Sequence, residues 1–329
     1  MADVARAAGV SVMTVSYTYS RPDRVSAEAA ARVRAAAEQL SYPGPHPAAR
    51  SLRRGRVGSV GVVLGEPLTY AFDDPQAARF LAGVAGVCVA ERAGLTLVPI
   101  TGEPDDVDRV AEAVVDGFVL WTTADDDPVV NAVVATGLPA AVHGGPDRGL
   151  PVVTIDNRAA ARAIGAEAFA HARRPAVLSF PLDRTRESVV LVDPEPAAAT
   201  FPITRERLAG YRAATTRPLK VAVCERNSAA EGARLAAALM GEDTPPDAIA
   251  AMSDELALGA LQVAPDVPIT GWDDSDAAEQ AGLTTVRQSL HDQGAECARI
   301  ALGGTPSGEP AEWGVVRRTQ GRFRGSPRS

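Results

Sequence analysis

The sequence lacks an apolar run long enough to cross a membrane, and it is poor in aromatic residues. A transmembrane helix needs about 18 or more uninterrupted apolar residues, whereas the best runs, such as 60–64, are far shorter. Aromatic residues make up only 5% of the 329 residues, which disfavours a platform that stacks single-stranded nucleic acid. Asp3 and Arg6 interrupt the N-terminal apolar residues, so no secretory signal is visible. We therefore expect a cytoplasmic protein without a membrane partner.

Cysteine and histidine are also scarce. Cys88, Cys224 and Cys297 lie far apart in apolar stretches, which is expected of buried free thiols rather than of a disulfide framework. The four histidines lack the spacing of metal ligands, and the sequence contains no phosphate-binding glycine loop, zinc-protease motif or nucleophile elbow. The sequence therefore predicts no metal, no cofactor and no enzymatic activity.

Charge is divided unevenly along the chain. The net charge is −8, but the first 56 residues hold nine arginines and four acidic residues, a balance of +5, which leaves −13 for the remainder. A basic head suits phosphate binding, and an acidic body suits a small-molecule domain. The alternative is that the basic surface is merely solvated, because the sequence does not show whether the arginines cluster on one face.

The first 42 residues predict three short helices, over 2–8, 11–19 and 27–40. Gly9 stands between the first two and permits the positive φ of a tight interhelical turn. Ser11 and Ser26 are suited to cap the second and third helices. Apolar residues at helical spacing predict one small core, formed by Val4, Ala5, Ala8, Val10, Val15, Val25, Val33, Ala36, Ala37 and Leu40.

A proline-rich segment follows this head. Pro43, Pro45 and Pro47 end the third helix, because proline lacks a backbone N–H and restricts the residue before it. The arginine-rich stretch 48–54 is too short to form a stable helix alone. These features favour a hinge that folds only on a partner.

From residue 57 onward, apolar runs alternate with amphipathic segments. We expect strands over 57–64, 95–100, 117–121, 139–143, 152–155, 176–180, 219–224, 248–252 and 267–271. We expect helices over 75–92, 105–115, 128–136, 158–171, 204–215, 228–240 and 254–262. This alternation predicts parallel sheets covered by helices on both faces, and so many strands suit two sheets better than one. The poorly periodic stretch 182–202 is expected to be a surface excursion.

Several motifs together resemble one family. The stretch 3–20, with the segments 24–28, 32–34, 39–43 and 47–52, resembles the DNA-binding head and hinge of LacI/GalR repressors. The segments 153–157, 207–211, 253–261, 269–274 and 283–288 resemble landmarks of that family's effector domain. The resemblance implies an α/β protein with an all-α helix-turn-helix head over 1–42, a hinge over 43–56 and an effector and dimerisation domain over 57–329. This last domain would contain two periplasmic-binding-protein-like subdomains with parallel sheets, over about 57–155 plus 288–312 and 156–287 plus 313–322.

The resemblance also implies which head residues contact DNA. The side chains expected to face base edges are Val12, Met13 and Tyr17. The hydroxyls expected near phosphates, where they fix register, are those of Ser11, Thr14, Ser16 and Ser20. Many members have arginine in place of Tyr17 and asparagine in place of Ser20. We therefore expect Val12 and Met13 to favour thymine methyls and Tyr17 to offer one hydroxyl hydrogen bond.

In the hinge, Ala49 and Leu52 fall at positions that enter the minor groove as an apolar wedge. Arg50, Arg53 and Arg54 would then lie near phosphates, and His46 replaces an asparagine that is common in the family. The alternative is a flexible linker without a wedge.

For the ligand pocket, Arg207 and Asp273 are the first candidates. Arginine offers a planar fork of donors and aspartate a pair of acceptors, which together suit vicinal hydroxyls or an amide-bearing ring. The resemblance adds an aromatic wall from Tyr70 and Phe72, and the remaining candidates are Asn227, Asp254 and Gln288. Each residue also has a structural alternative, since the aspartates suit helix caps and Arg207 suits a surface ion pair. Gly65 replaces a serine found in some members, which leaves the ligand class open.

The sequence as a whole predicts a homodimeric repressor that binds a double-stranded DNA operator under the control of a sugar or nucleoside-like effector. An effector acts in such a protein by binding one conformation more tightly than another. The competing hypothesis is a solute-binding protein or an α/β enzyme with an incidental helical extension.

Overall fold

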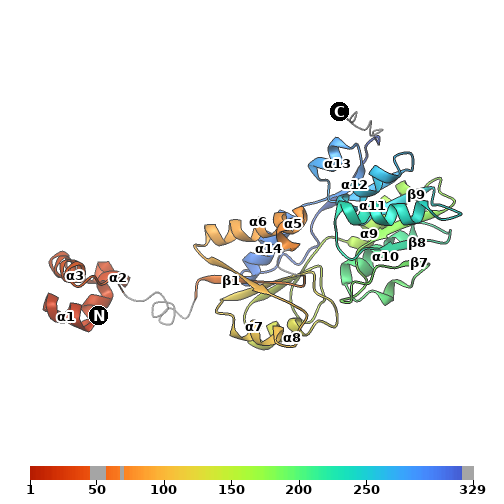
Figure 1. The fold of residues 1–329 in the computed structure, drawn as a ribbon. Helices are drawn as coiled ribbons and strands as arrows, with labels where there is room; N and C mark the ends of the chain where they lie inside the picture. The colour runs from red at the N-terminus through yellow and green to blue at the C-terminus, as the bar shows by residue number, and fades with distance from the viewer. Residues whose placement is uncertain (45–56, 67–69, 321–329) are drawn as a thin grey trace. The chain divides into compact units, whose positions relative to one another are not determined.

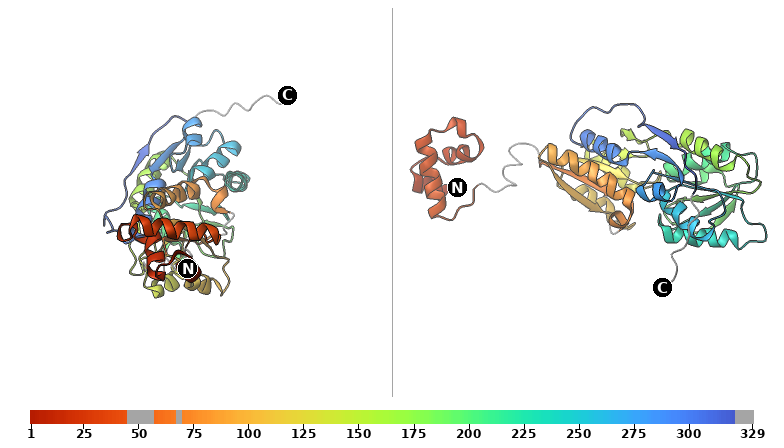
Figure 2. Two further views of the ribbon diagram at one scale, coloured as in Figure 1. Left: turned by 90° about the vertical axis from the view of Figure 1, so that its left-hand side faces the viewer. Right: turned by 90° about the horizontal axis from the view of Figure 1, so that it is seen from above.

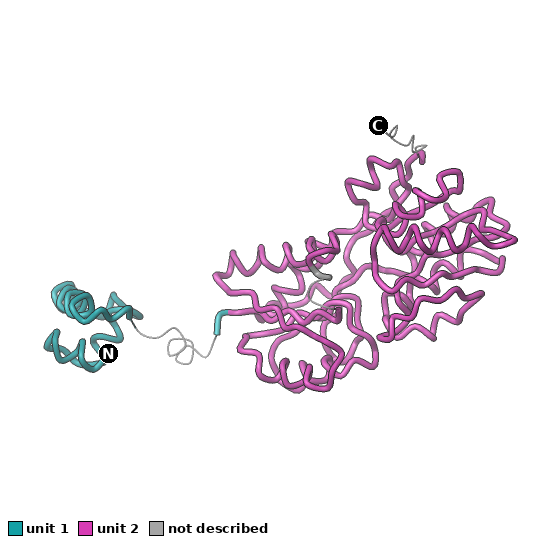
Figure 3. Tube along the Cα trace, in the orientation of Figure 1, with its two compact units in different colours: residues 1–58 teal, residues 59–329 magenta. Residues whose placement is uncertain are grey.

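A computed structural model describes residues 1–44, 57–66 and 70–320. The chain forms two compact units, Met1–Gly58 and Ser59–Ser329 (Figures 1 and 3). The hinge residues for which DNA contacts are predicted lie outside the described residues, so those contacts stay predictions: His46, Ala49, Arg50, Leu52, Arg53 and Arg54. Over the described ranges, no helix has the length and apolar character needed to cross a membrane.

The described part of the N-terminal unit is helical. Its elements are α1 (Ala2–Ala8), α2 (Val12–Ser20), the short 3-10 helix η1 (Pro22–Arg24) and α3 (Ala27–Gln39). Gly9 ends α1 with a φ of 63°, as the predicted turn requires. The Ser11 Oγ accepts a hydrogen bond from the Thr14 N–H at 3.0 Å, and Ser26 caps α3 in the same way. The predicted helix-turn-helix is therefore confirmed.

The core of this unit differs from the prediction at one end. Most of the predicted apolar residues are buried together, but Leu40 is 48% exposed. The reason is that α3 ends at Gln39, and the chain turns away at Ser41, which has a φ of 48°. Tyr19 and Tyr42 pack against the core instead, with their rings edge to face and 6.4 Å apart.

The first half of the second unit contains a parallel sheet in the order β2-β1-β3-β4-β5. Its strands are β1 (Ser59–Leu64), β2 (Gly94–Pro99), β3 (Gly117–Trp121), β4 (Ala140–His143) and β5 (Val152–Val153). The helices α6 (Pro75–Ala90) and α14 (Leu290–Ala301) pack side by side on one face (Figures 1 and 2). The helices α7 (Asp106–Glu112) and α8 (Pro128–Thr136) cover the other face. Successive side chains of β1 point to opposite faces of the sheet, so Val62 faces α6 and Val63 faces α8.

The second half contains a sheet in the order β12-β11-β10-β9-β6-β8-β7. Its parallel strands are β6 (Pro175–Ser179), β8 (Lys220–Val223), β9 (Ala248–Ala251), β10 (Ile269–Trp272) and β11 (Thr284–Gln288). The edge strands β7 (Val190–Val192) and β12 (Trp313–Val316) pair antiparallel to their neighbours. One face is covered by α9 (Asn157–Phe169) and α10 (Pro202–Ala213), and the other by α11 (Ala229–Met240), α12 (Asp254–Val263) and α13 (Asp276–Gln280). The predicted pair of α/β sheets is thus confirmed.

The stretch 182–202 is more ordered than its sequence suggests. It lies largely at the surface, as expected, but it contains the edge strand β7 and the 3-10 helix η2 (Pro196–Ala198), which the sequence does not predict. Val190 and Val192 are exposed on the outer side of the sheet. A strand of three residues is too short for its alternation of apolar and polar side chains to be recognised in the sequence.

Paired glycines bring helices into backbone contact in both halves. A Cβ on Gly83 of α6 would overlap the carbonyl oxygen of His291 in α14, and one on Gly294 of α14 would overlap the carbonyl oxygen of Phe80 in α6. Gly232 of α11 and Gly259 of α12 are related in the same reciprocal way. These glycines are required by the close approach of the helices and not by an unusual φ.

Candidate ligand-binding cleft

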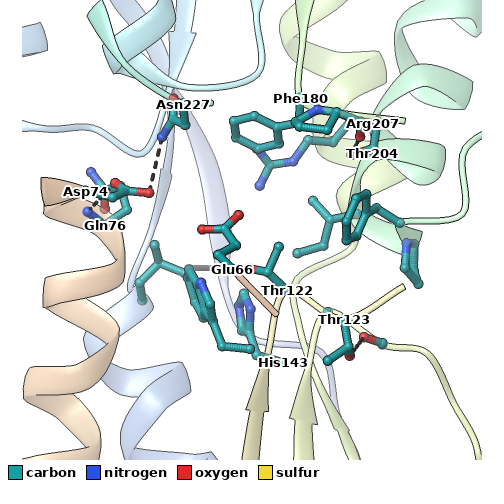
Figure 4. A pocket seen from close by; sticks show the side chains of 18 of the residues that line it. Glu66, Asp74, Gln76, Thr122, Thr123, His143, Phe180, Thr204, Arg207 and Asn227 are labelled. Carbon is teal, nitrogen blue, oxygen red and sulfur yellow. Dashed lines mark hydrogen bonds between the residues drawn. The ribbon is translucent and has the colours of Figure 1, made fainter. Parts of the chain in front are cut away.

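A cavity that is open to solvent lies between the two halves of the second unit. Its lining comes from the carboxyl ends of strands in both sheets, with Glu66 following β1, His143 ending β4 and Asp273 following β10. Open α/β sheets bind ligands at this edge. In Figure 4, Arg207 and Phe180 enter the cavity from the second half, opposite Glu66 and His143.

Arg207, on α10, is almost fully buried at one wall of the cavity. Its Nε donates to the Asn157 Oδ1 at 2.9 Å and its Nη1 to the Met252 carbonyl at 2.5 Å. The guanidinium carbon lies 3.8 Å from the centre of the Trp272 ring, a favourable cation–π contact. Burial lowers the pKa of Arg207 to about 10, and attraction to Asp273 opposes this shift. The guanidinium is therefore a rigid, charged donor.

Asp273 ends a hydrogen-bond chain that crosses between the halves. Its Oδ1 accepts from the Gln288 Nε2 at 2.8 Å, and the Gln288 Oε1 accepts from the Gln293 Nε2 at 3.3 Å. The Gln293 Oε1 then meets the His143 Nε2 at 3.1 Å. Burial raises the pKa of Asp273 well above its usual range, although Arg207 and the Gln288 amide favour its charged form.

The direction of this chain fixes the tautomer of His143. The Gln293 Nε2 also donates to the Ser289 carbonyl, so the Gln293 Oε1 faces the imidazole, and an amide oxygen only accepts. His143 must therefore carry its proton on Nε2. Its Nδ1 is a buried acceptor that has no partner among the described residues. The ring stacks on Trp121 with their centres 4.5 Å apart.

Two further polar contacts bridge the cleft. Arg186, in the loop after β6, donates to the Glu66 Oε1 at 3.2 Å. Asn227, after β8, donates to the Asp74 Oδ2 at 3.4 Å, while the Asp74 Oδ1 caps α6. Burial raises the pKa of Glu66 to about 7, against the attraction of Arg186. These two contacts join the first half of the second unit to its second half across the cleft.

The structure brings together four of the seven predicted ligand residues. Those that line the cavity are Arg207, Asn227, Asp273 and Gln288. Phe72, in α5 (Tyr70–Asp73), is 66% exposed and is not among the described residues lining the cavity. The side chain of Tyr70 lies outside the described set. Asp254 is buried beside the site, where it accepts from the Ser275 N–H and the Thr285 hydroxyl, both at 2.7 Å.

Sequence reasoning missed Glu66, Asp74, His143 and Arg186. Glu66 follows a predicted strand and His143 ends another, so the rule that open α/β sheets bind ligands at strand ends would have identified both. Asp74 directly precedes a predicted helix, and that rule does not identify it. Arg186 lies in the poorly periodic stretch 182–202, where the sequence gives no such signal.

In the head, α2 presents its first turn outward. Met13 is 62% exposed and Val12 is 47% exposed, whereas Tyr17 is half-buried. Ser11, Thr14 and Ser20 are at least partly accessible, but their hydroxyls already make hydrogen bonds within the helix. Ser16 is buried.

Family models match both parts of the chain. Residues 1–44 match bacterial regulatory proteins of the lacI family, and residues 90–267 match the periplasmic binding proteins and sugar binding domain of the LacI family. The HTH-type transcriptional regulator Rv3575c of Mycobacterium tuberculosis is 35% identical over 331 residues, which cover 94% of this chain and 92% of the relative. The chain belongs to the LacI family.

Solved structures of LacI-family proteins share the fold. A LacI-family transcriptional regulator from Corynebacterium glutamicum is 27% identical, with a TM-score of 0.72 over 97% of this chain and 98% of that one. The lac repressor dimer bound to operator and the anti-inducer ONPF is 20% identical, with a TM-score of 0.74 over 97% of each chain. This LacI-family chain is thus a DNA-binding transcriptional regulator with a sugar-binding type of domain, and not an enzyme.

His143 gives the LacI-family cleft a predictable pH dependence. Burial lowers its pKa from 6.5 to about 4, more strongly than the hydrogen bond to Gln293 raises it. Between these values the unfolded chain binds a proton that the folded chain excludes, so this group lowers stability as the pH falls from 6.5 toward 4. We expect His143→Gln to be more stable, relative to the wild type, at pH 5 than at pH 7.5, by roughly 1–3 kcal/mol.

Urea denaturation of the second unit at the two pH values measures this difference. The control is His171→Gln, which changes an exposed histidine of the same unit. If the free energy of unfolding differs between His143→Gln and the wild type by the same amount at both pH values, His143 is not held neutral.

Proposed function

We propose that this chain is a homodimeric repressor whose affinity for a DNA operator is set by a sugar bound in the cleft. The observation that carries this proposal is the pairing of a charged donor, Arg207, with carboxyl and amide acceptors around one cavity between two halves. Hydroxyl groups on a ring match such donors and acceptors. The family's sugar binding domain supports a sugar over a nucleoside-like ligand.

We propose that α2 enters the major groove. Val12 and Met13 are exposed apolar side chains at its start, as expected of groups that contact thymine methyls. Tyr17 supplies one hydroxyl, and Ser11, Thr14, Ser16 and Ser20 contact or support contacts to phosphates. The lac repressor, which shares the fold, is bound to operator in its solved structure.

The functional divisions proposed are a head over 1–42, a hinge over 43–56 and an effector domain over 57–329. In the hinge, Ala49 and Leu52 form the minor-groove wedge, Arg50 and Arg53 contact phosphates and His46 stands near the groove. Since its proposed target is chromosomal DNA, the protein acts in the cytoplasm.

The dimer is proposed to form through the outer face of α6. Ala78, Ala82, Ala85 and Val89 repeat at spacings of four and three residues on this helix, and Val89 is 79% exposed. Such spacing places them on one face, where burial of apolar side chains favours association. The related lac repressor structure is a dimer.

An effector then acts through a difference in affinity for two arrangements of the halves. A coupling of about 1–3 kcal/mol is usual for allosteric proteins and corresponds to roughly 5–150-fold in operator affinity. The contacts Glu66–Arg186 and Asp74–Asn227 join the halves, so a ligand that changes them changes the balance between the arrangements.

A gel-shift titration with the DNA upstream of the protein's own gene tests this function. We expect Met13→Asp to weaken binding about 10-fold or more, because each specific base contact contributes about 1–3 kcal/mol. Leu40→Asp is the control, since it adds the same charge at another exposed apolar side chain of the head and should change affinity far less.

Two further measurements accompany the gel-shift titration. Neutral sugars added singly should change operator affinity 5–150-fold, and sedimentation should show that Val89→Glu shifts the protein toward monomer. The absence of a specific complex with any upstream fragment, at low or high salt, would contradict the repressor.

A further inference from the structure

We infer that the cleft rejects phosphorylated ligands because Glu66 occupies Arg186, so that the effector is an uncharged polyol. The inference rests on the proposed function for the identity of the ligand as an effector, but the selectivity itself is a property of the cavity. Glu66 is thereby a specificity-determining residue of the site.

The positive groups of the cavity are already engaged. Among the described lining residues, the guanidinium groups are those of Arg186 and Arg207, and His143 is held neutral. A phosphate ester carries a charge of about −1.5 to −2 at neutral pH and requires a cation or several N–H donors. Its binding therefore depends on whether either arginine is available.

Arg186 already forms an ion pair with Glu66. Its Nη2 lies 3.2 Å from the Glu66 Oε1 and 3.4 Å from the Gly65 carbonyl, and its guanidinium carbon lies 5.6 Å from the centre of the Phe201 ring. The two side chains are only 21% and 12% exposed, so water screens the pair weakly. A phosphate approaching Arg186 would have to displace this carboxylate or lie beside it.

Arg207 already makes hydrogen bonds and a cation–π contact within the protein. Two of its nitrogens donate to Asn157 and to the Met252 carbonyl, and its face is covered by Trp272. Its charge is also attracted to Asp273. Its remaining N–H groups can donate to a neutral hydroxyl of a ligand.

The remaining acidic groups add to the rejection of anions. Figure 4 shows Glu66 pointing into the cavity between Asp74 on one side and Arg207 on the other. Asp74 is buried, and its Oδ2 accepts a hydrogen bond from the Asn227 amide. Ligand hydroxyls can donate to both carboxylates, whereas a phosphate would face like charges in a poorly screened space.

Removal of Glu66 should convert the cleft into an anion site. We expect Glu66→Gln to bind inorganic phosphate at least 10-fold more tightly than the wild type in calorimetric titrations at pH 8 and constant ionic strength. The pH is set above the pKa of Glu66 so that the wild-type side chain is ionised. The gain should disappear in Glu66→Gln/Arg186→Gln.

The matched control is Glu206→Gln. Glu206 pairs with Arg158 at 2.8 Å on the surface of the same unit, so this change also frees an arginine, but outside the cavity. It should leave phosphate binding as in the wild type.

Wild-type phosphate affinity equal to that of Glu66→Gln would overturn the inference. So would the absence of a gain in Glu66→Gln, or a gain that persists in the double variant. Failure of every sugar to alter operator affinity, with the phosphate results as expected, would instead remove the proposed function and leave the selectivity of the cavity intact.

Discussion

Replacement of Arg207 by methionine is expected to weaken the response to effector at least 100-fold, measured as the sugar concentration that half-maximally changes operator affinity. Operator affinity without sugar should stay within a few-fold of the wild type. Hydrogen bonds to a charged donor contribute about 1.5–3 kcal/mol each, and two such bonds to a ligand exceed the 2.7 kcal/mol that corresponds to 100-fold. Methionine keeps an apolar stem beside Trp272 but cannot donate.

The control is Arg212→Met, on the same helix α10. Arg212 pairs with Asp193 outside the cavity, so the change removes a surface ion pair, which is worth about 0–1 kcal/mol, and should leave the sugar response intact. Circular dichroism and thermal unfolding of both variants distinguish lost ligand contacts from misfolding. An unchanged sugar response in Arg207→Met would show that the ligand binds elsewhere.

The largest stability effect is expected at the crossing of α6 and α14. Gly83→Ala places a methyl group against the backbone of His291 and Ala295, where no side chain can move aside. Overpacking of a rigid contact costs about 1–3 kcal/mol or more. Gly86→Ala, three residues later on α6, meets no atom within 4 Å and should gain about 0.5–1 kcal/mol from helix propensity.

Urea unfolding of the two variants measures the contrast. The expected difference of roughly 2–4 kcal/mol between two chemically identical substitutions isolates the helix contact from propensity. Similar stabilities for the two variants would mean that α6 and α14 are not in backbone contact.

The sequence predicts much of the fold because local patterns specify it. Helical spacing, Gly9 and Ser11 specify the head, and buried strands such as β3 are continuous apolar runs. The helix α14 was not among the predicted elements. It packs on the first sheet more than 130 residues after that sheet's last strand, β5. The family resemblance assigns 288–312 to this half, but no local pattern in the sequence indicates the return.

The cleft is only partly predictable for a similar reason. Asp254 and Asp273 each follow a strand near the start of a helix or turn, so their sequence contexts are alike. Only the folded chain shows that Asp254 turns toward the backbone of Ser275 while Asp273 faces the cavity. The role of Glu66 depends on Arg186, which lies 120 positions away, and no local pattern joins them.

The paired glycines at the contacts of α6 with α14 and of α11 with α12 also limit where the second unit can change shape. Helices that meet backbone to backbone cannot slide without a collision of carbonyl groups, so α6 with α14 and α11 with α12 behave as fixed blocks. A change in cleft width must then be absorbed where the chain passes between halves: between β5 and α9, between β11 and α14, and between α14 and β12. Gln288 and Gln293 stand on either side of the second of these crossings. A ligand that binds Asp273, as we propose, would therefore act at a crossing between two rigid halves.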